Sequence, residues 1–310
     1  MSDANIPPVL AEVTRSGIVE SQHRGHMVVL AADGSVQFAL GNPNISIFPR
    51  SSIKCIQASA MVRAGLKLEP RLLALVAASH SGATMHQDGA REILASVDLD
   101  ESALLNASDK PLGDEERKQW GAKPATALAH NCSGKHAGML ATCVKNGWSL
   151  GNYLEASHPL QVACRQELEN LAQEKVSLVS VDGCGAPLFV LSLMGLARTI
   201  HAITISTDPV HVSVLRACKQ FPEMVAGEGR LTTRKMREIP GLFIKEGAEA
   251  VEVGSLPDGR TFVFKIEDGS WRAFGPIVVR ILERFGIPSK DEVTPIYGGK
   301  EVIGSIRAIF

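Results

Sequence analysis

Patterns typical of β-strands lie at the two ends of this chain, and helical patterns fill the long middle. Near the N-terminus, residues 26–40 (HMVVLAADGSVQFAL) place Asp33-Gly34 between two alternating runs, which is a strong hairpin signal. Further strands are predicted in IKEGAEAVEVG and RTFVFKIEDG, which flank a turn at residues 257–259, and in the terminal EVIGSIRAIF. Pairing is the simplest way to bury such strands, so we expect one antiparallel sheet built from both chain ends.

The middle of the chain predicts a mainly helical lobe. Ile53, Ile56, Ala60 and Met61 have spacings that fit one face of a helix. Other helices are expected at residues 72–78, 90–96, from 133 onward, 159–173, 187–200, 210–220 and 271–286. The fold class is therefore expected to be α/β, with an antiparallel sheet flanked by helices and a mainly helical lobe beside it.

The length of the chain suits one domain with two lobes. Single hydrophobic cores stop growing at roughly 250–300 residues, and the chain has 310. We expect a single domain over residues 1–310, in which 1–60 with 241–310 form the α/β lobe and 61–240 form the helical lobe. A cleft between the lobes is the expected place for a site.

The charges of the chain are balanced, with 32 Lys and Arg against 33 Asp and Glu and no long block of one sign. This composition argues against a nucleic-acid or anionic-membrane binder and favours a small neutral or zwitterionic partner. The N-terminus lacks the pattern of a secretory signal, and no apolar run reaches the roughly 18 residues of a membrane span. Six scattered cysteines fit buried thiols or ligands in a cytoplasmic protein.

The sharpest local motif is Pro49-Arg50-Ser51-Ser52-Ile53-Lys54. A serine in the first turn of a helix and a lysine three residues later project from the same face, so Lys54 can lie within hydrogen-bonding reach of Ser51. A lysine whose pKa is lowered by burial can accept the hydroxyl proton and make the serine a nucleophile. The same residues also fit an N-cap serine followed by a surface lysine.

Two further polar positions are candidates for the same site. The segment Ser79-His80-Ser81-Gly82 follows an apolar helix and is expected to form a loop that places a second hydroxyl in a cleft, although it also fits a simple helix C-cap. Lys265 lies among apolar residues of a predicted strand. Alternation alone does not decide whether its side chain points into the cleft or into solvent.

Two glycine-containing turns each carry a cysteine, Cys132 in NCSGKH and Cys184 in VDGCGAP. Two thiolates from separate loops can bind zinc, and Lys135 or His136 can complete an open site. Cysteines that are merely packed in the core explain the same residues equally simply.

Taken together, these motifs resemble those of the rhizobial-type L-asparaginases, also called the asparaginase II family. The blocks run in order from about residue 9 to the end: VESQHRGHMVVLAADGSV, FPRSSIKCIQA, SHSG, NCSGKHAGML, HPLQ, DGCGAP, KEGAEA and KIEDG. The fold of that family is similar to the folds of serine β-lactamases and glutaminases, and the resemblance implies hydrolysis of L-asparagine to L-aspartate and ammonia by a homodimeric enzyme.

The resemblance also implies roles for particular residues. The family has two Ser-Lys pairs, which correspond here to Ser51 with Lys54 and to Ser79 with Lys265. It also implies a zinc ion. Because a serine already supplies the nucleophile, we expect the metal to orient the substrate. The zinc ligands would be Cys132, Lys135 and Cys184. The residues expected to bind substrate are Arg50, His80, Ser81 and Asp182.

Three positions depart from the family pattern, namely Ala83, Asn106-Ala107 and Ala250. These departures leave the proposed nucleophiles and metal ligands unchanged. They keep two alternatives open beside an asparaginase: a glutaminase or other Ser-x-x-Lys amidohydrolase, and a degenerate member that binds an amino acid without turnover.

Overall fold

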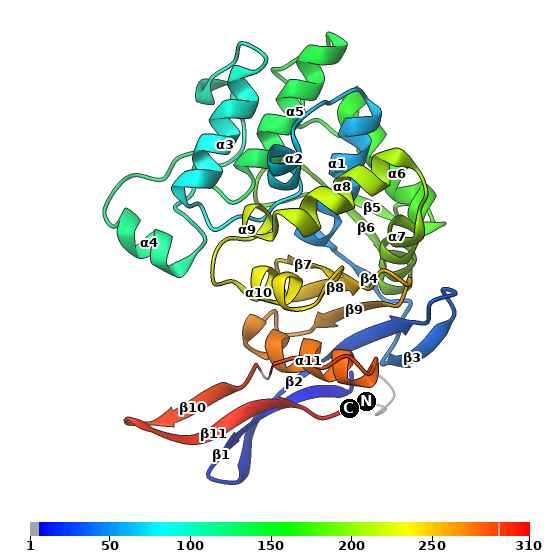
Figure 1. The fold of residues 1–310 in the computed structure, drawn as a ribbon, viewed down its shortest axis with the longest axis vertical. Coiled ribbons are helices and arrows are strands. Elements are labelled where there is room, and N and C mark those ends of the chain that lie inside the picture. Colours follow the sequence, from blue (N-terminus) through cyan, green and yellow to red (C-terminus); the bar gives the residue numbers. More distant parts are fainter. Residues whose placement is uncertain (1–5, 291) are drawn as a thin grey trace.

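The computed structural model describes residues 6–290 and 292–310. Its largest element is an antiparallel sheet in the order β10-β11-β1-β2-β9-β8-β7, with β3 paired to β2 as well, which gives eight strands within the described residues. The strands are β1 (Val9–Arg15), β2 (Ile18–Leu30), β3 (Val36–Leu40), β7 (Phe243–Gly247), β8 (Val251–Ser255), β9 (Thr261–Ile266), β10 (Thr294–Gly298) and β11 (Glu301–Ala308). The expected sheet from both chain ends is confirmed, and Figure 1 shows the blue and red strands side by side.

The long strand β2 holds this sheet together because it changes partner along its length. Its first half pairs with β1 and its second half with β3, while residues 25–30 pair with β9 on the opposite edge. Gly25 lies where β2 changes partner, and a Cβ there would lie 2.2 Å from the carbonyl oxygen of Lys265. Only glycine allows the backbones of β2 and β9 to approach so closely.

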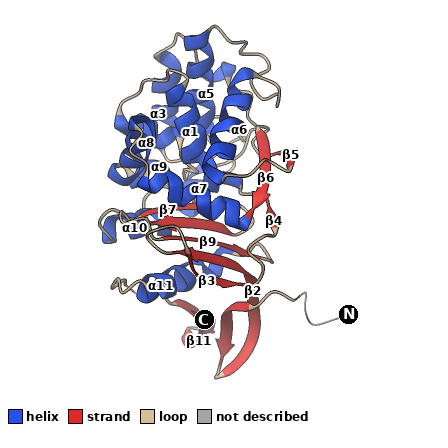
Figure 2. Ribbon diagram, turned by 90° about the vertical axis from the view of Figure 1, so that its right-hand side faces the viewer, coloured by secondary structure: helices blue, strands red, loops and turns tan. Residues whose placement is uncertain are grey.

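Helices cover both faces of the sheet and form most of the other lobe (Figure 2). Helix α7 packs on β2, β8 and β9, whereas α11 packs on β1 and β11. The α-helices are α1 (Lys54–Arg63), α2 (Pro70–Val76), α3 (Thr84–Ala95), α4 (Asp114–Trp120), α5 (Ser133–Asn146), α6 (Pro159–Ala172), α7 (Leu193–Ile205), α8 (Pro209–Gln220), α9 (Pro222–Val225), α10 (Leu231–Glu238) and α11 (Phe274–Arg284). Short 3₁₀ helices are η2 (Arg50–Ile53), η3 (Glu101–Ala103) and η4 (Trp271–Ala273).

The predicted helix at residues 187–200 is wrong in its first half. Residues 187–192 form β6 (Pro187–Ser192), which lies between β4 (Ser46–Ile47) and β5 (Leu178–Val181) in a small second sheet. The run PLFVL is buried along its whole length, and a continuous apolar run of this length fits a buried strand as well as a helix. The helix begins only at Leu193, where the Ser192 hydroxyl accepts a hydrogen bond from the backbone N–H of Gly195.

The segment IKEGAEAVEVG, expected as one strand, is a hairpin of β7 and β8. Its turn contains two non-glycine residues in the left-handed region, Glu249 with φ of 58° and Ala250 with φ of 55°. A left-handed residue with a side chain is strained, which is consistent with glycine being usual in the family at the position of Ala250. The strand β10 and the helices α4, α9 and α10 were not predicted from the sequence.

In the core, α5 lies directly against α2. The ideal Cβ of an alanine at Gly138 would lie 2.7 and 2.8 Å from the two Cγ atoms of Val76. The β-branched side chain of Val76 has little rotamer freedom to move away. We therefore expect Gly138→Ala to lower the free energy of unfolding by about 1–3 kcal/mol, despite the better helix propensity of alanine.

Urea denaturation measures this change. Gly151→Ala is the matched control, because nothing lies within 4 Å of its Cβ, and its effect should stay within about 0.5 kcal/mol. Equal stability of the Gly138 variant and the wild type would show that α2 and α5 are not closely packed here.

Candidate active site

The hydroxyl of Ser79 lies between two buried lysine amines. Ser79 follows the end of α2, Lys54 is the first residue of α1, and Lys245 lies on the edge strand β7. The Ser79 Oγ is 3.1 Å from Lys54 Nζ and 2.9 Å from Lys245 Nζ. All three side chains are buried, with at most 3% exposed. Three separate segments of the fold thus meet at one hydroxyl.

Burial and a neighbouring charge both act on the amine of Lys245. Desolvation, followed by the charge of Lys54, lowers the pKa of Lys245 to about 8. Its amine also donates to the backbone carbonyl of Glu246 at 2.8 Å. A lysine in this range exists in part as the neutral amine near neutral pH, and a neutral amine can accept a proton from a hydroxyl.

Lys54 is bonded differently from what the motif predicted. Its Nζ donates to the Ala78 carbonyl at 2.5 Å and lies 3.0 Å from Cys132 Sγ. Within residues 6–290 and 292–310 no hydrogen bond joins Lys54 to Ser51. Ser51 lies in η2 just before α1, and it is buried with 8% of its surface exposed. The structure therefore places Ser51 beside the start of α1 with its hydroxyl free of the lysine.

The assignment of Lys265 as the partner of Ser79 is corrected by the structure, which places Lys245 there. Lys265 lies on β9, two strands away from β7, about 10 Å across the sheet. Its half-buried amine donates to the carbonyl of Ile266. The missed signal was the KEGAEA block, in which Lys245 follows the apolar pair Phe243-Ile244 in a predicted strand.

The cysteines and Lys135 come together as expected from the resemblance. Cys132 directly precedes α5, Lys135 lies in the first turn of that helix, and Cys184 lies in the turn between β5 and β6. The Lys135 Nζ is 3.2 Å from Cys184 Sγ. Lys54 contacts Cys132, so it joins this cluster to Ser79.

The pKa values of the two thiols are shifted in opposite directions. Their mutual hydrogen bond raises the pKa of Cys132 and holds the pKa of Cys184 well below its usual value. Burial opposes the charge of Lys135, but the two neighbouring cysteines outweigh it and raise the pKa of its amine. The described part of the chain holds no group of three or more His, Cys, Asp or Glu side chains that could bind a metal. Two thiols and an amine are nevertheless three donors that zinc can bind once the amine has lost its proton.

Arg50 and Asp182, expected to bind substrate, are bonded to each other. The Arg50 Nε lies 2.8 Å from Asp182 Oδ1, and Arg50 has a left-handed φ of 52°. Burial opposes ionisation of Asp182, but the charges of Lys135 and Arg50 lower its pKa. A backbone held in a strained conformation at a candidate site suggests a functional constraint.

His80 and Ser81 make their bonds away from Ser79. The His80 Nε2 lies 2.9 Å from Ser133 Oγ, and the His80 ring stacks on His86. Desolvation holds the pKa of His80 well below its usual value, so the ring is neutral. The Ser81 hydroxyl donates to Glu116 Oε1 at 2.7 Å. These bonds fix the loop that presents Ser79.

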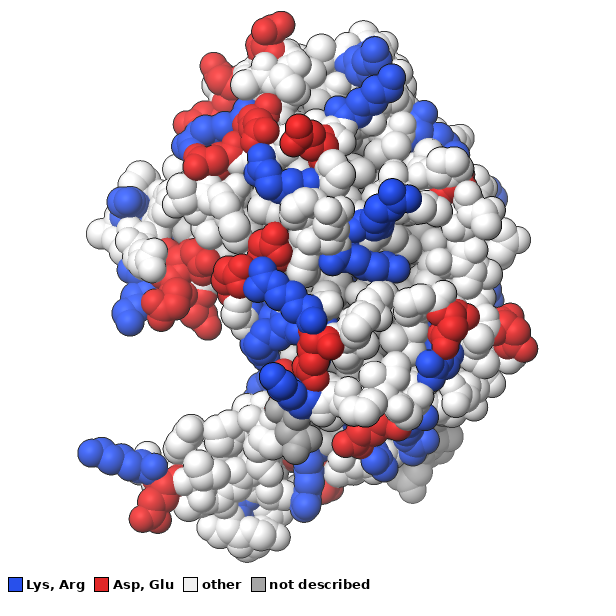
Figure 3. All heavy atoms as spheres, viewed as in Figure 1, with Lys and Arg blue, Asp and Glu red and all other residues white. Residues whose placement is uncertain are grey.

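A cavity of about 390 Å³ lies next to β7, and residues not singled out in the sequence line it. Glu246, the neighbour of Lys245, forms an ion pair with Arg230, whose guanidinium lies 5.8 Å from the ring centre of Trp271. Figure 3 shows a deep indentation on this face, with blue and red side chains along its inner wall. Across from Glu246 on β8, both carboxyl oxygens of Glu252 are buried without a partner in the described residues, and desolvation raises its pKa.

The chain matches the L-asparaginase II family over residues 11–307 and belongs to that family. It is therefore an amidohydrolase, an enzyme that hydrolyses amide bonds. None of the curated proteins matches it. No helix in the described ranges is long and apolar enough to cross a membrane.

Several solved structures are similar to this chain at low sequence identity. Mglu in its native form is 13% identical, with a TM-score of 0.48 over 93% of this chain and 71% of that one. A β-lactamase from Mycobacterium bovis is 14% identical, with a TM-score of 0.42 over 84% of this chain and 94% of that one. A putative β-lactamase from Bacteroides dorei is 13% identical, with a TM-score of 0.44 over 84% and 93%. All three scores lie below 0.5, and nothing about activity follows from them.

Proposed function

We propose that this chain is an L-asparaginase, which hydrolyses L-asparagine to L-aspartate and ammonia. The observation that carries the proposal is the position of the Ser79 hydroxyl within hydrogen-bonding distance of both Lys54 and Lys245. Two buried amines around one hydroxyl can move protons during attack on an amide. Membership of the L-asparaginase II family supports asparagine as the amide.

The two serines have different surroundings, which supports different roles. A hydroxyl between two amines can accept a proton from one and donate its own proton to the other, so Ser79 suits a proton relay. The Ser51 hydroxyl makes no hydrogen bond within the described ranges, and Ser51 is 8% exposed against 3% for Ser79. Ser51 is therefore the better candidate for attack on a bound substrate.

In the proposed reaction, Ser51 Oγ attacks the side-chain amide carbon of asparagine. Its proton passes to Lys54, whose amine turns toward Ser51 once substrate is bound. Backbone N–H groups at the start of η2 and α1 stabilise the oxyanion. The C–N bond then breaks, and ammonia leaves with a proton supplied through Ser79. Water then attacks the resulting ester, and its proton passes through Ser79 to the neutral amine of Lys245. That proton returns to Ser51 as aspartate is released.

Arg50 and Asp182 are proposed to hold the backbone groups of the amino acid. Their ion pair opens so that the guanidinium binds the α-carboxylate and the carboxylate binds the α-ammonium. The contact of 3.8 Å between Asp182 Oδ2 and Cys184 Sγ places this pair beside the cysteine cluster. Recognition of both charges favours a free amino acid over a peptide.

Zinc is proposed to bind Cys132, Lys135 and Cys184, where it would orient the substrate. A serine already supplies the nucleophile, so the metal is not needed to activate water.

We also propose a cytoplasmic homodimer. The six cysteines are all free thiols, which suits a reducing compartment, and a two-fold dimer is the commonest assembly; light scattering of the purified protein would test the dimer.

Removal of either serine should abolish most turnover. Ser51→Ala and Ser79→Ala are each expected to lower kcat for ammonia release from asparagine by at least about 10²-fold, because nucleophile and relay are both needed. Coupled ammonia assays with asparagine and with glutamine measure this.

Ser59→Ala is the matched control, since Ser59 is a buried serine on α1 that bonds only the carbonyl of Cys55. Its kcat should stay near that of the wild type. Full activity of the Ser51 variant would exclude it as nucleophile, faster turnover of glutamine would identify a glutaminase, and binding of asparagine without ammonia release would identify a sensor.

The pH profile should report Lys245. Its amine must be neutral to accept a proton, and its pKa is lowered to about 8, so kcat/KM should rise from pH 6.5 and level off above about pH 9. Lys245→Arg keeps a permanent charge and should remove this rise together with most of the activity. A wild-type profile that is flat between pH 7 and 9 contradicts the role of Lys245.

Loss of the metal should weaken substrate binding more than chemistry. We expect Cys132→Ala to lose zinc by elemental analysis and to raise KM by a larger factor than it lowers kcat. Cys164→Ala changes a buried thiol of α6 outside the cluster and should retain zinc. If the Cys132 variant loses kcat entirely at unchanged KM, the orienting role is wrong; if the wild type holds no zinc, the metal proposal fails.

A further inference from the structure

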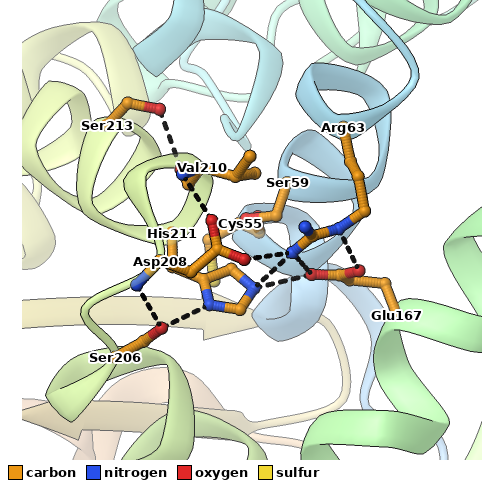
Figure 4. Close-up of polar contacts among 9 residues, drawn as sticks. All are labelled: Cys55, Ser59, Arg63, Glu167, Ser206, Asp208, Val210, His211 and Ser213. Atoms are coloured by element: carbon orange, nitrogen blue, oxygen red, sulfur yellow. Dashed lines mark hydrogen bonds and ion pairs between the residues drawn. The ribbon is translucent and has the colours of Figure 1, made fainter.

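A second polar cluster lies at the corner between α7 and α8, away from Ser79 (Figure 4). Its members come from four segments: Arg63 from the end of α1, Glu167 from α6, Ser206 from the end of α7, and His211 from the first turn of α8. Arg63 is nine residues beyond Lys54, or about 13 Å along the axis of α1. The cluster is therefore separate from the Ser-Lys centre.

The side chains of this cluster are connected in the order serine, imidazole, carboxylate. The Ser206 Oγ lies 2.7 Å from His211 Nδ1, and His211 Nε2 lies 2.6 Å from Glu167 Oε1. With a neutral imidazole, Nε2 donates to the carboxylate and Nδ1 accepts from the hydroxyl. This is the hydrogen-bond direction that activates a serine in hydrolases with a Ser-His-acid triad.

Other groups hold the carboxylate and the ring in place. Arg63 donates to both oxygens of Glu167 at 3.0 Å and to Asp208 at 2.7 Å. Burial opposes ionisation of Glu167, but the hydrogen bonds from His211 and Arg63 lower its pKa. The backbone N–H of Asp208 donates to Ser206 Oγ at 3.2 Å, which leaves one lone pair of the hydroxyl oxygen free. The ring is buried, with 6% of the residue exposed, and both of its nitrogens are hydrogen-bonded.

Ser206 also lines a cavity of about 520 Å³. Apolar side chains, among them Val212 and Leu215, form much of its wall. The basic side chains of Arg216 and Lys219 also line it, together with Thr204. Positive charge beside a serine can stabilise the oxyanion of a tetrahedral intermediate. A cavity of this size with an apolar wall fits a small ester with a short, apolar acyl group.

We propose that Ser206, His211 and Glu167 form a second hydrolytic site, which cleaves esters of short apolar acids. Ser206 Oγ attacks the ester carbonyl carbon, and its proton passes to His211 Nδ1. The alkoxy leaving group departs with that proton, which leaves Ser206 acylated. Water then attacks the acyl group, gives a proton to His211 and releases the acid, and His211 returns the proton to Ser206.

A fluorophosphonate probe tests this site in the full-length protein, because it reacts covalently with activated serines. Peptide mass spectrometry is expected to find the probe on Ser206. Hydrolysis of p-nitrophenyl butyrate is measured in parallel. We expect Ser206→Ala to remove the label from that peptide and Glu167→Gln to slow labelling by about 10²-fold or more, since the amide cannot stabilise the imidazolium.

Ser213→Ala is the matched control. Ser213 lies on α8, as His211 does, and donates only to the carbonyl of Val210 at 2.8 Å. The probe should therefore label Ser206 of the Ser213→Ala variant at the wild-type rate. Unchanged urea unfolding of the Ser206 variant separates loss of labelling from loss of fold. An unlabelled Ser206 in the wild type would overturn the proposal without bearing on Ser51 or Ser79. The ester assay is run in the Ser51→Ala background, where hydrolysis that survives the added Ser206→Ala change would also overturn it.

Discussion

The pairing of β2 with β9 is the constraint on which the candidate active site depends. It joins residues 25–30 to residues 261–266, and the hairpins that follow carry the chain to the edge strand β7. The edge of the sheet then faces the helices, and the period-two alternation of β7 points Lys245 toward the loop after α2. Lys245 and Ser79 are 166 residues apart in the chain. Their contact exists because backbone hydrogen bonds in the sheet fix the direction of β7.

The burial of many ionisable groups is the second feature of this site. A continuous path of polar contacts runs from Lys245 through Ser79 and Lys54 to Cys132, with Lys135 and Cys184 beside it. Burying so many ionisable groups costs free energy, whereas well-packed apolar side chains in the same place would not carry this cost. Perturbed pKa values of this kind cluster at functional sites, and here the lysine pKa is lowered where a base is needed, while the thiols share a proton where a metal would be held.

The sequence predicted the candidate site better through its ordered motifs than through any single spacing. Ser79, Cys132, Lys135 and Cys184 lie together as the resemblance implied, although a bare Ser-x-x-Lys motif did not reveal that Lys54 bonds Ser79. Lys265 was assigned from the resemblance, and Lys245 was not considered, because neither motif says which strand lies at the edge of the sheet. That choice depends on the strand order of the sheet, which no local pattern contains.

The sequence by itself determined the local elements: the Asp33-Gly34 hairpin, the amphipathic helices and the strands at both ends. These follow from backbone preferences and apolar periodicity, which act over a few residues. The tertiary structure alone decided that residues 187–192 form a strand, that Arg50 pairs with Asp182, and that Ser206, His211 and Glu167 meet. Each of these depends on which segments pack together, because burial and hydrogen bonding between distant residues are properties of the folded chain.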